Sequence, residues 1–134
     1  MEQEDYLMRQ INQLARVLGE LLLDFIGSKN KGQVNIGIET INQVFKDELD
    51  YDIDELMNTS SDIFVNKLIT EKQFNNNCFE KLAEIFLQIA DSMEKNERKM
   101  LYEKCIVIFE YLDMSSNVFS VERQWKKEQI KKYL

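Results

Sequence analysis

The feature that most restricts the fold of this chain is its shortage of residues that make tight turns. The sequence of 134 residues contains no proline and only four glycines, whereas sheet proteins need such residues for the frequent reversals between strands. Apolar residues instead recur at steps of three and four. The sequence therefore predicts an all-α fold: a single compact bundle of five to seven helices, two of them short, in one domain over residues 1–134.

The first predicted helix has an unusually wide apolar surface. One stripe is expected to face the core and consists of Leu7, Ile11, Leu14, Leu18, Leu21 and Phe25. On a helical wheel, Met8, Leu23 and Ile26 fall outside this stripe, and Gly19 lies beside them. Either other helices surround this helix, or its second face pairs with a copy of the chain across a twofold axis. We prefer the homodimer, because so small a bundle can hardly enclose one helix on all sides.

Capping residues predict where the helices begin and end. Gly27 is expected to end the first helix, and Asn30 is expected to cap the second. Asp52 and Glu55 occupy the N-cap and third positions of a capping box and so predict a short helix. The other predicted features are a helix start at Ser60 or Ser61, a capping box at Thr70–Gln73, a start at Ser120, and inward-facing Val118, Val121 and Trp125.

Two predicted helices in the second half of the chain, over residues 78–95 and 97–114, form an antiparallel hairpin because their connection is short. Residues in this hairpin match positions of a tetratricopeptide (TPR) repeat: Leu82, Ala83 and Phe86 in the first helix, Tyr102 and Cys105 in the second. The hairpin therefore resembles a single TPR unit. With the opening segment 4–11, the chain also resembles a family of small uncharacterised bacterial helical proteins. These resemblances imply a fold and no activity.

The charge of the chain argues against two classes of partner. The net charge of −7 comes from residues 1–60, with 12 acidic and 5 basic residues, whereas residues 61–134 carry 12 of each. An acidic chain repels phosphate backbones, and no apolar run approaches the roughly 20 residues of a membrane helix. We therefore expect no nucleic-acid partner and no membrane partner. An acidic opening segment and two cysteines without CxxC spacing favour a cytoplasmic location.

The candidate catalytic groups do not come together in the predicted hairpin. The sequence has no histidine, which removes the commonest general base and zinc ligand. Asp91 with Glu94 and Glu110 with Asp113 resemble the paired carboxylates of magnesium-dependent hydrolases, but the hairpin separates the two pairs by ~18 Å. We expect no enzymatic activity, no cofactor and no metal site. A metal-dependent hydrolase that acts through acidic residues is the alternative.

The two cysteines are predicted to pack in the hydrophobic core. In a hairpin whose turn is centred near residue 96, Cys105 lies level with residue 87, too far from Cys78 for a disulfide. Both are expected to pack as small hydrophobic residues.

The preferred function is a non-enzymatic module that binds another protein or itself. Its expected interaction surface consists of Asp50, Asp52, Asp54, Glu55 and Leu23. The four acids lie in the strongest local negative charge, which suits a basic partner, although an exposed and solvated turn is the alternative. Their spacing starts like a calcium loop but lacks its glycine and its last glutamate. Basic residues stand among aromatic ones over residues 123–133, a mixture that is typical of contact with nucleic acid or an anionic membrane surface. Neutralisation of residues 47–55 by these bases, in the same chain or in a neighbour, is the alternative.

Overall fold

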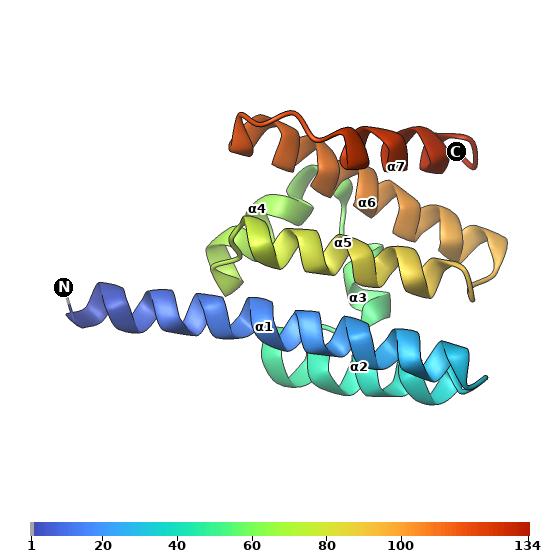
Figure 1. Cartoon of the computed structure of the whole chain (residues 1–134), viewed down its shortest axis with the longest axis horizontal. Coiled ribbons are helices and arrows are strands. Elements are labelled where there is room, and N and C mark those ends of the chain that lie inside the picture. Colours follow the sequence, from blue (N-terminus) through green and yellow to red (C-terminus); the bar gives the residue numbers. More distant parts are fainter. Residues whose placement is uncertain (1) are drawn as a thin grey trace.

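The computed structural model describes residues 2–134, except for the side chains of residues 2–8, 11 and 12. The described chain forms seven helices and no strands (Figure 1). They are α1 (Glu2–Asn30), α2 (Val34–Leu49), α3 (Ile53–Asn58), α4 (Ser61–Lys72), α5 (Asn76–Ala90), α6 (Lys95–Ser116) and α7 (Val121–Lys131). The predicted all-α bundle is confirmed.

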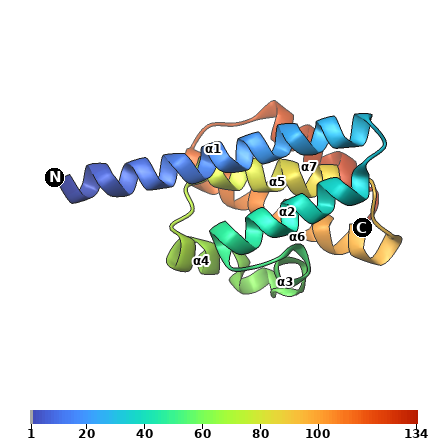
Figure 2. The same cartoon turned by 90° about the horizontal axis from the view of Figure 1, so that it is seen from below.

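The centre of the bundle is α5. Its buried residues are Cys78, Phe79, Leu82, Ala83, Ile85, Phe86, Ile89 and Ala90. α6 packs antiparallel along one side of α5 and also contacts α3, α4 and α7, while α1 packs along another side and contacts α2. Figures 1 and 2 show α1 and α2 on the face opposite to α7, with the first turns of α1 extending past the other helices. The prediction that other helices might surround the first helix is therefore wrong.

Aromatic side chains fill the space between the helices. Phe25 on α1, Phe45 on α2, Phe64 on α4 and both Phe79 and Phe86 on α5 are fully buried. The rings of Phe64 and Phe86 lie 6.3 Å apart, which joins α4 to α5. Such aromatic pairs add about 0.5–1.5 kcal/mol to the effect of area burial. One continuous core therefore connects α1 through α6.

The ends of the helices differ from the predictions at several glycine and asparagine residues. α1 continues through Gly27 and ends in a Schellman motif, in which the Gln33 N–H donates to the Ser28 carbonyl and Gly32 adopts a φ of 71°. Asn30 is thus the last residue of α1 rather than the cap of α2. The capping box of Asp52 and Glu55 is confirmed.

The predicted capping box at Thr70–Gln73 is wrong. α4 continues to Lys72, and Gln73 is its left-handed C-cap with a φ of 54°. The side chain of Asn75 caps α5 instead, because it accepts a hydrogen bond from the Cys78 N–H. α4 and α7 begin after Ser60 and Ser120 as predicted.

The antiparallel hairpin of α5 and α6 is present, although its turn lies earlier than predicted. α5 ends at Ala90, and the guanidinium of Arg98 donates to the carbonyls of Ala90 and Met93, which fastens the turn. The shift moves Cys105 level with Ala83, whose carbonyl oxygen lies 3.6 Å from the Sγ of Cys105.

The close contact between α1 and α2 depends on a glycine. A Cβ at Gly37 on α2 would lie 2.7 Å from Cδ2 of the buried Phe25.

Two glycine substitutions test this packing. We expect Gly37→Ala to destabilise the protein by about 1–3 kcal/mol, because the new methyl group displaces a buried ring. The matched variant Gly27→Ala places a methyl group in open space within α1 and should stabilise by about 0.5–1 kcal/mol. Urea unfolding followed by circular dichroism measures both. A stabilised Gly37→Ala variant would contradict the close packing of α1 and α2.

Candidate functional site

The predicted acidic surface lies at the junction of α2, α3 and α4, where its carboxylates have partners in the same chain. Asp50 ends α2 with a φ of 62°, and its carboxylate pairs with Lys72 on α4. The hydrogen bond from Lys72 lowers the pKa of Asp50 below its ordinary value. The side chain of Asp52 accepts from the Glu55 N–H at 2.8 Å as the N-cap of α3.

Of the two remaining acids of this surface, Glu55 has a basic partner, whereas Asp54 is exposed to solvent. Glu55 pairs with Lys46, whose hydrogen bond lowers the pKa of Glu55, and the same bond raises the pKa of Lys46. Asp54 lies exposed in the first turn of α3. Lysines of α2 and α4, and not the C-terminal bases, therefore neutralise this junction. The prediction that the bases of residues 123–132 neutralise residues 47–55 of the same chain is wrong.

Leu23, the apolar member of the predicted surface, is 69% exposed on α1. Its expected neighbours contribute less: Ile26 is half-buried, and the side chain of Met8 lies outside the described residues. Gly19 does not offer a free surface either, because it faces Lys81 on α5: a Cβ at Gly19 would lie in van der Waals contact with Cε of Lys81, at 3.6 Å. Among the described members of this predicted face, the structure therefore does not bring Leu23, Ile26 and Gly19 into one broad apolar surface.

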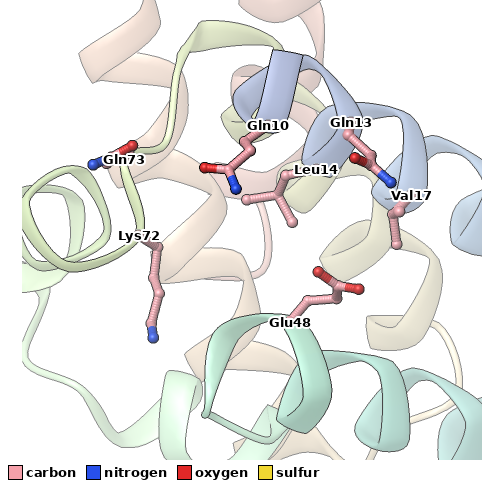
Figure 3. Close-up of a pocket in the computed structure, with 7 residues that line it drawn as sticks. All are labelled: Gln10, Gln13, Leu14, Val17, Glu48, Lys72 and Gln73. Carbon is pink, nitrogen blue, oxygen red and sulfur yellow. The ribbon is translucent and has the colours of Figure 1, made fainter. Parts of the chain in front are cut away.

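A polar groove of about 320 Å³ opens between α1 and the C-terminal ends of α2 and α4 (Figure 3). It is lined by Gln10, Gln13, Leu14, Val17, Glu48, Lys72 and Gln73. Lys72 is engaged by Asp50, and Figure 3 shows the Glu48 carboxylate on the α2 side of the groove. One carboxylate among side-chain amides does not supply the paired groups of general acid–base catalysis. The groove therefore supplies no recognisable reaction chemistry.

Two of the four carboxylates considered for a metal site, Asp91 and Asp113, are paired with bases of other helices. Asp91 lies 3.3 Å from Lys29 of α1, while Asp113 lies 3.0 Å from Arg123 and 2.6 Å from Lys127 of α7. In the part of the chain that the structure describes, no three acidic or cysteine residues are placed to hold a metal ion. These acids thus hold helices together.

Both cysteines are buried, as predicted. Burial raises the pKa of the Cys78 and Cys105 thiols. A raised pKa depletes the thiolate, which is the nucleophilic form of cysteine. The pair is therefore part of the core on α5 and α6.

Ion pairs attach α7 to the rest of the bundle. The guanidinium of Arg123 lies 3.5 Å from Glu80 of α5 and also bonds Asp113 of α6. Lys126 pairs with Glu84 of α5, and Ile130 is the buried residue of α7. Arg123, Lys126 and Ile130 recur at steps of three and four, so they define the inward side of this helix. The side of α7 that contacts the rest of the bundle therefore consists mainly of basic side chains.

The opposite side of α7, the preceding loop and the last turns of α6 expose large apolar side chains. We call this set the apolar apron: Met114, Val118, Phe119, Val121 and Trp125, with exposed fractions of 82%, 67%, 75%, 73% and 59%. The prediction that Val118, Val121 and Trp125 face inward is wrong, because cations occupy the inward side. Sequence reasoning missed this surface. Two sequence patterns could have revealed it. Arg123, Lys126 and Lys127 are three and four residues apart, which places three bases on one side of α7, and Glu80 and Glu84 are four residues apart, which places two acids on one side of α5.

An aromatic groove of about 380 Å³ continues from the apron along α5 and α7. Trp125 belongs to both surfaces, and the groove also contains Leu87, Tyr102 and Tyr133. The rings of Tyr102 and Tyr133 lie 5.6 Å apart. The groove therefore extends the exposed apolar surface of α7 towards the C-terminal end of this helix.

Lys104 on α6 is the buried charged residue among those described, with an exposed fraction of 4%. Its Nζ lies 3.4 Å from the Ser61 hydroxyl and 5.9 Å from the centre of the Phe64 ring. Burial lowers its pKa. Because the amine is packed between α4 and α6, the lowered pKa reflects the cost of burying a charge rather than a reactive site.

We expect Lys104→Met to raise the melting temperature at pH 7, because methionine fills a similar space without a buried ammonium. The advantage should shrink as the pH rises towards 10.5, the ordinary lysine value. Over that range the folded wild-type chain loses its proton before the unfolded chain does, so the wild-type protein gains stability. Scanning calorimetry at pH 7 and pH 9.5 measures the difference. A lower melting temperature for the variant at pH 7 would contradict this account.

The attachment of α7 should weaken when its ion pairs are removed. We expect Asp113→Asn to destabilise by about 0.5–1.5 kcal/mol and to accelerate amide hydrogen exchange in α7, because Arg123 and Lys127 lose a shared carboxylate. High salt should accelerate the same amides in the wild-type protein. Bonds from Lys127 and Arg123 lower the pKa of Asp113, so its contribution is present above the ordinary carboxyl pKa and disappears as the pH falls through the lowered value.

Glu128→Gln is the control, because Glu128 is exposed and lies on the outward side of α7. Its exchange pattern should match that of the wild-type protein. Protection of α7 that is independent of salt and unchanged in Asp113→Asn would show that apolar contacts hold the helix.

No family model, no curated protein and no solved structure matches this chain. Within the described residues, no helix has the length and the apolar character that crossing a membrane requires.

Proposed function

We propose that this chain is a non-enzymatic protein-interaction module of the cytoplasm. The observation that carries the proposal is the apolar apron on the end of α6, the following loop and α7. Five large apolar side chains that are each more than half exposed lie within residues 114–125. Single exposed apolar residues are ordinary, whereas soluble proteins rarely expose a contiguous patch larger than a few hundred Å² without a binding role.

The orientation of α7 supports this proposal. An amphipathic helix normally buries its apolar side and exposes its charges. In α7 the order is reversed, because Arg123 and Lys126 face the acids of α5 while Val121 and Trp125 face outwards. Burial of Val121 and Trp125 against a partner would supply the apolar contact that the fold itself leaves unused.

The surface predicted from sequence remains a second proposal for the same function. Leu23 is exposed on α1, and Asp54 is exposed beside the paired Asp50, Asp52 and Glu55. Internal pairing leaves less negative charge for a basic partner than the sequence suggested. The resemblance of the α5–α6 hairpin to a TPR unit, and of the chain to small bacterial helical proteins, is likewise kept as a proposal.

A metal-dependent hydrolase has no structural observation in its favour. Of the carboxylates that suggested it, Asp91 and Asp113 bond to lysine and arginine side chains. Ligands for a divalent cation need carboxylates that converge without such partners.

Affinity purification from the native cell after brief cross-linking tests the proposed function. The wild-type chain is compared with a triple variant in which Val118, Phe119 and Val121 become serine. We expect the triple variant to lose its specific partners at least tenfold, because a few central apolar residues carry most of the binding energy. Ile36→Ser on α2 is the control, since it removes an exposed apolar side chain that belongs to neither proposed surface. Equal recovery of all partners by the triple variant would overturn the role of the apron.

A further inference from the structure

We infer that the apolar apron binds a second copy of this chain in a twofold dimer, with the two α7 helices antiparallel. This inference rests on the proposed function and specifies its partner. It arises from the charge, area and symmetry of the apron.

The first argument is the charge of the apron. Each copy carries a net charge of −7, so two copies repel each other over most of their surface. Residues 114–121 form the longest uncharged run of the sequence, between Asp113 and Glu122. Both of these acids already pair with bases of α7. Contact between two aprons therefore brings the copies together where their repulsion is least.

The second argument is the area that is available. With the exposed fractions given above, the five apron side chains present on the order of 600–700 Å² in total, over the end of α6, the following loop and α7. Small specific interfaces bury about 600 Å² on each partner. The aromatic groove adjoins the apron at Trp125 and adds apolar surface at its edge. The apron and the edge of the groove together therefore present about the area that a small specific interface needs.

The arrangement of Val121 and Trp125 fixes the register. They are four residues apart and so lie on one side of α7. A twofold axis near residue 123 brings Val121 of each copy against Trp125 of the other. This pairing buries the two outward apolar residues of α7 together.

Light scattering after gel filtration of the purified full chain tests the dimer. At about 200 μM we expect a mass of about twice 16.0 kDa for the wild-type protein and of one chain for Val121→Glu. Leu23→Glu should remain a dimer, which separates the apron from the dimer through α1. Circular dichroism establishes that each variant is folded. A wild-type monomer, or a dimer that only Leu23→Glu dissociates, would overturn the inference.

Trp125 provides an independent readout because it is the single tryptophan of the chain and is 59% exposed. Its emission should shift to shorter wavelength as the wild-type concentration rises from 1 to 200 μM, and should remain unshifted in folded Val121→Glu. A second mixture tests the register: Val121→Lys and Trp125→Glu, each monomeric alone, should form a mixed dimer with one native contact and one ion pair. Failure of this mixture to associate would overturn the antiparallel register.

Other occupants of the apron give different results. A wild-type monomer whose Trp125 emission shifts only with phosphatidylserine vesicles would replace the second copy with a membrane surface. A wild-type monomer whose apron variant still loses a cross-linked partner would overturn the dimer and leave the proposed interaction function intact.

Discussion

The burial of α5 is the constraint on which the arrangement of the other helices depends. α1 and α6 cover its apolar sides, and its remaining polar stripe carries Glu80, Glu84 and Gln88. Bases from the two ends of the chain cover this stripe: Arg123 and Lys126 from α7, and Lys29, which bonds Gln88. The exposed apolar side of α7 therefore follows from α5, because a helix that docks through cations must turn its apolar residues elsewhere.

The sequence was sufficient for those features that depend on neighbouring residues. The capping box of Asp52 and Glu55 and the burial of Leu18 and Phe25 follow from local geometry and from the spacing of apolar residues. Local sequence did not determine which of two glycines ends the first helix. Gly27 and Gly32 both permit a helix end, but the backbone turns at Gly32, where the Gln33 N–H and the Ser28 carbonyl close the Schellman motif.

The candidate site could be predicted only in part. Exposure of Leu23 followed from the helical wheel, whereas the pairing of Asp50 with Lys72 joins residues on two helices whose relative position the sequence does not reveal. The apron was predicted with the wrong side inward because apolar periodicity alone was taken to define the core face. That rule fails for a short helix that meets a polar stripe, since ion pairs and hydrogen bonds to that stripe then orient the helix.

The central position of α5 also affects the order in which the chain gains structure during synthesis. α1 and α2 contact each other early, but the apolar residues of α1 find their second partner on a helix that begins at residue 76. A nascent chain that ends before α5 therefore exposes those residues on the ribosome. Once α5 and α6 have emerged, their hairpin is a local contact that closes rapidly. Cooperative folding must then wait for the second half of the protein.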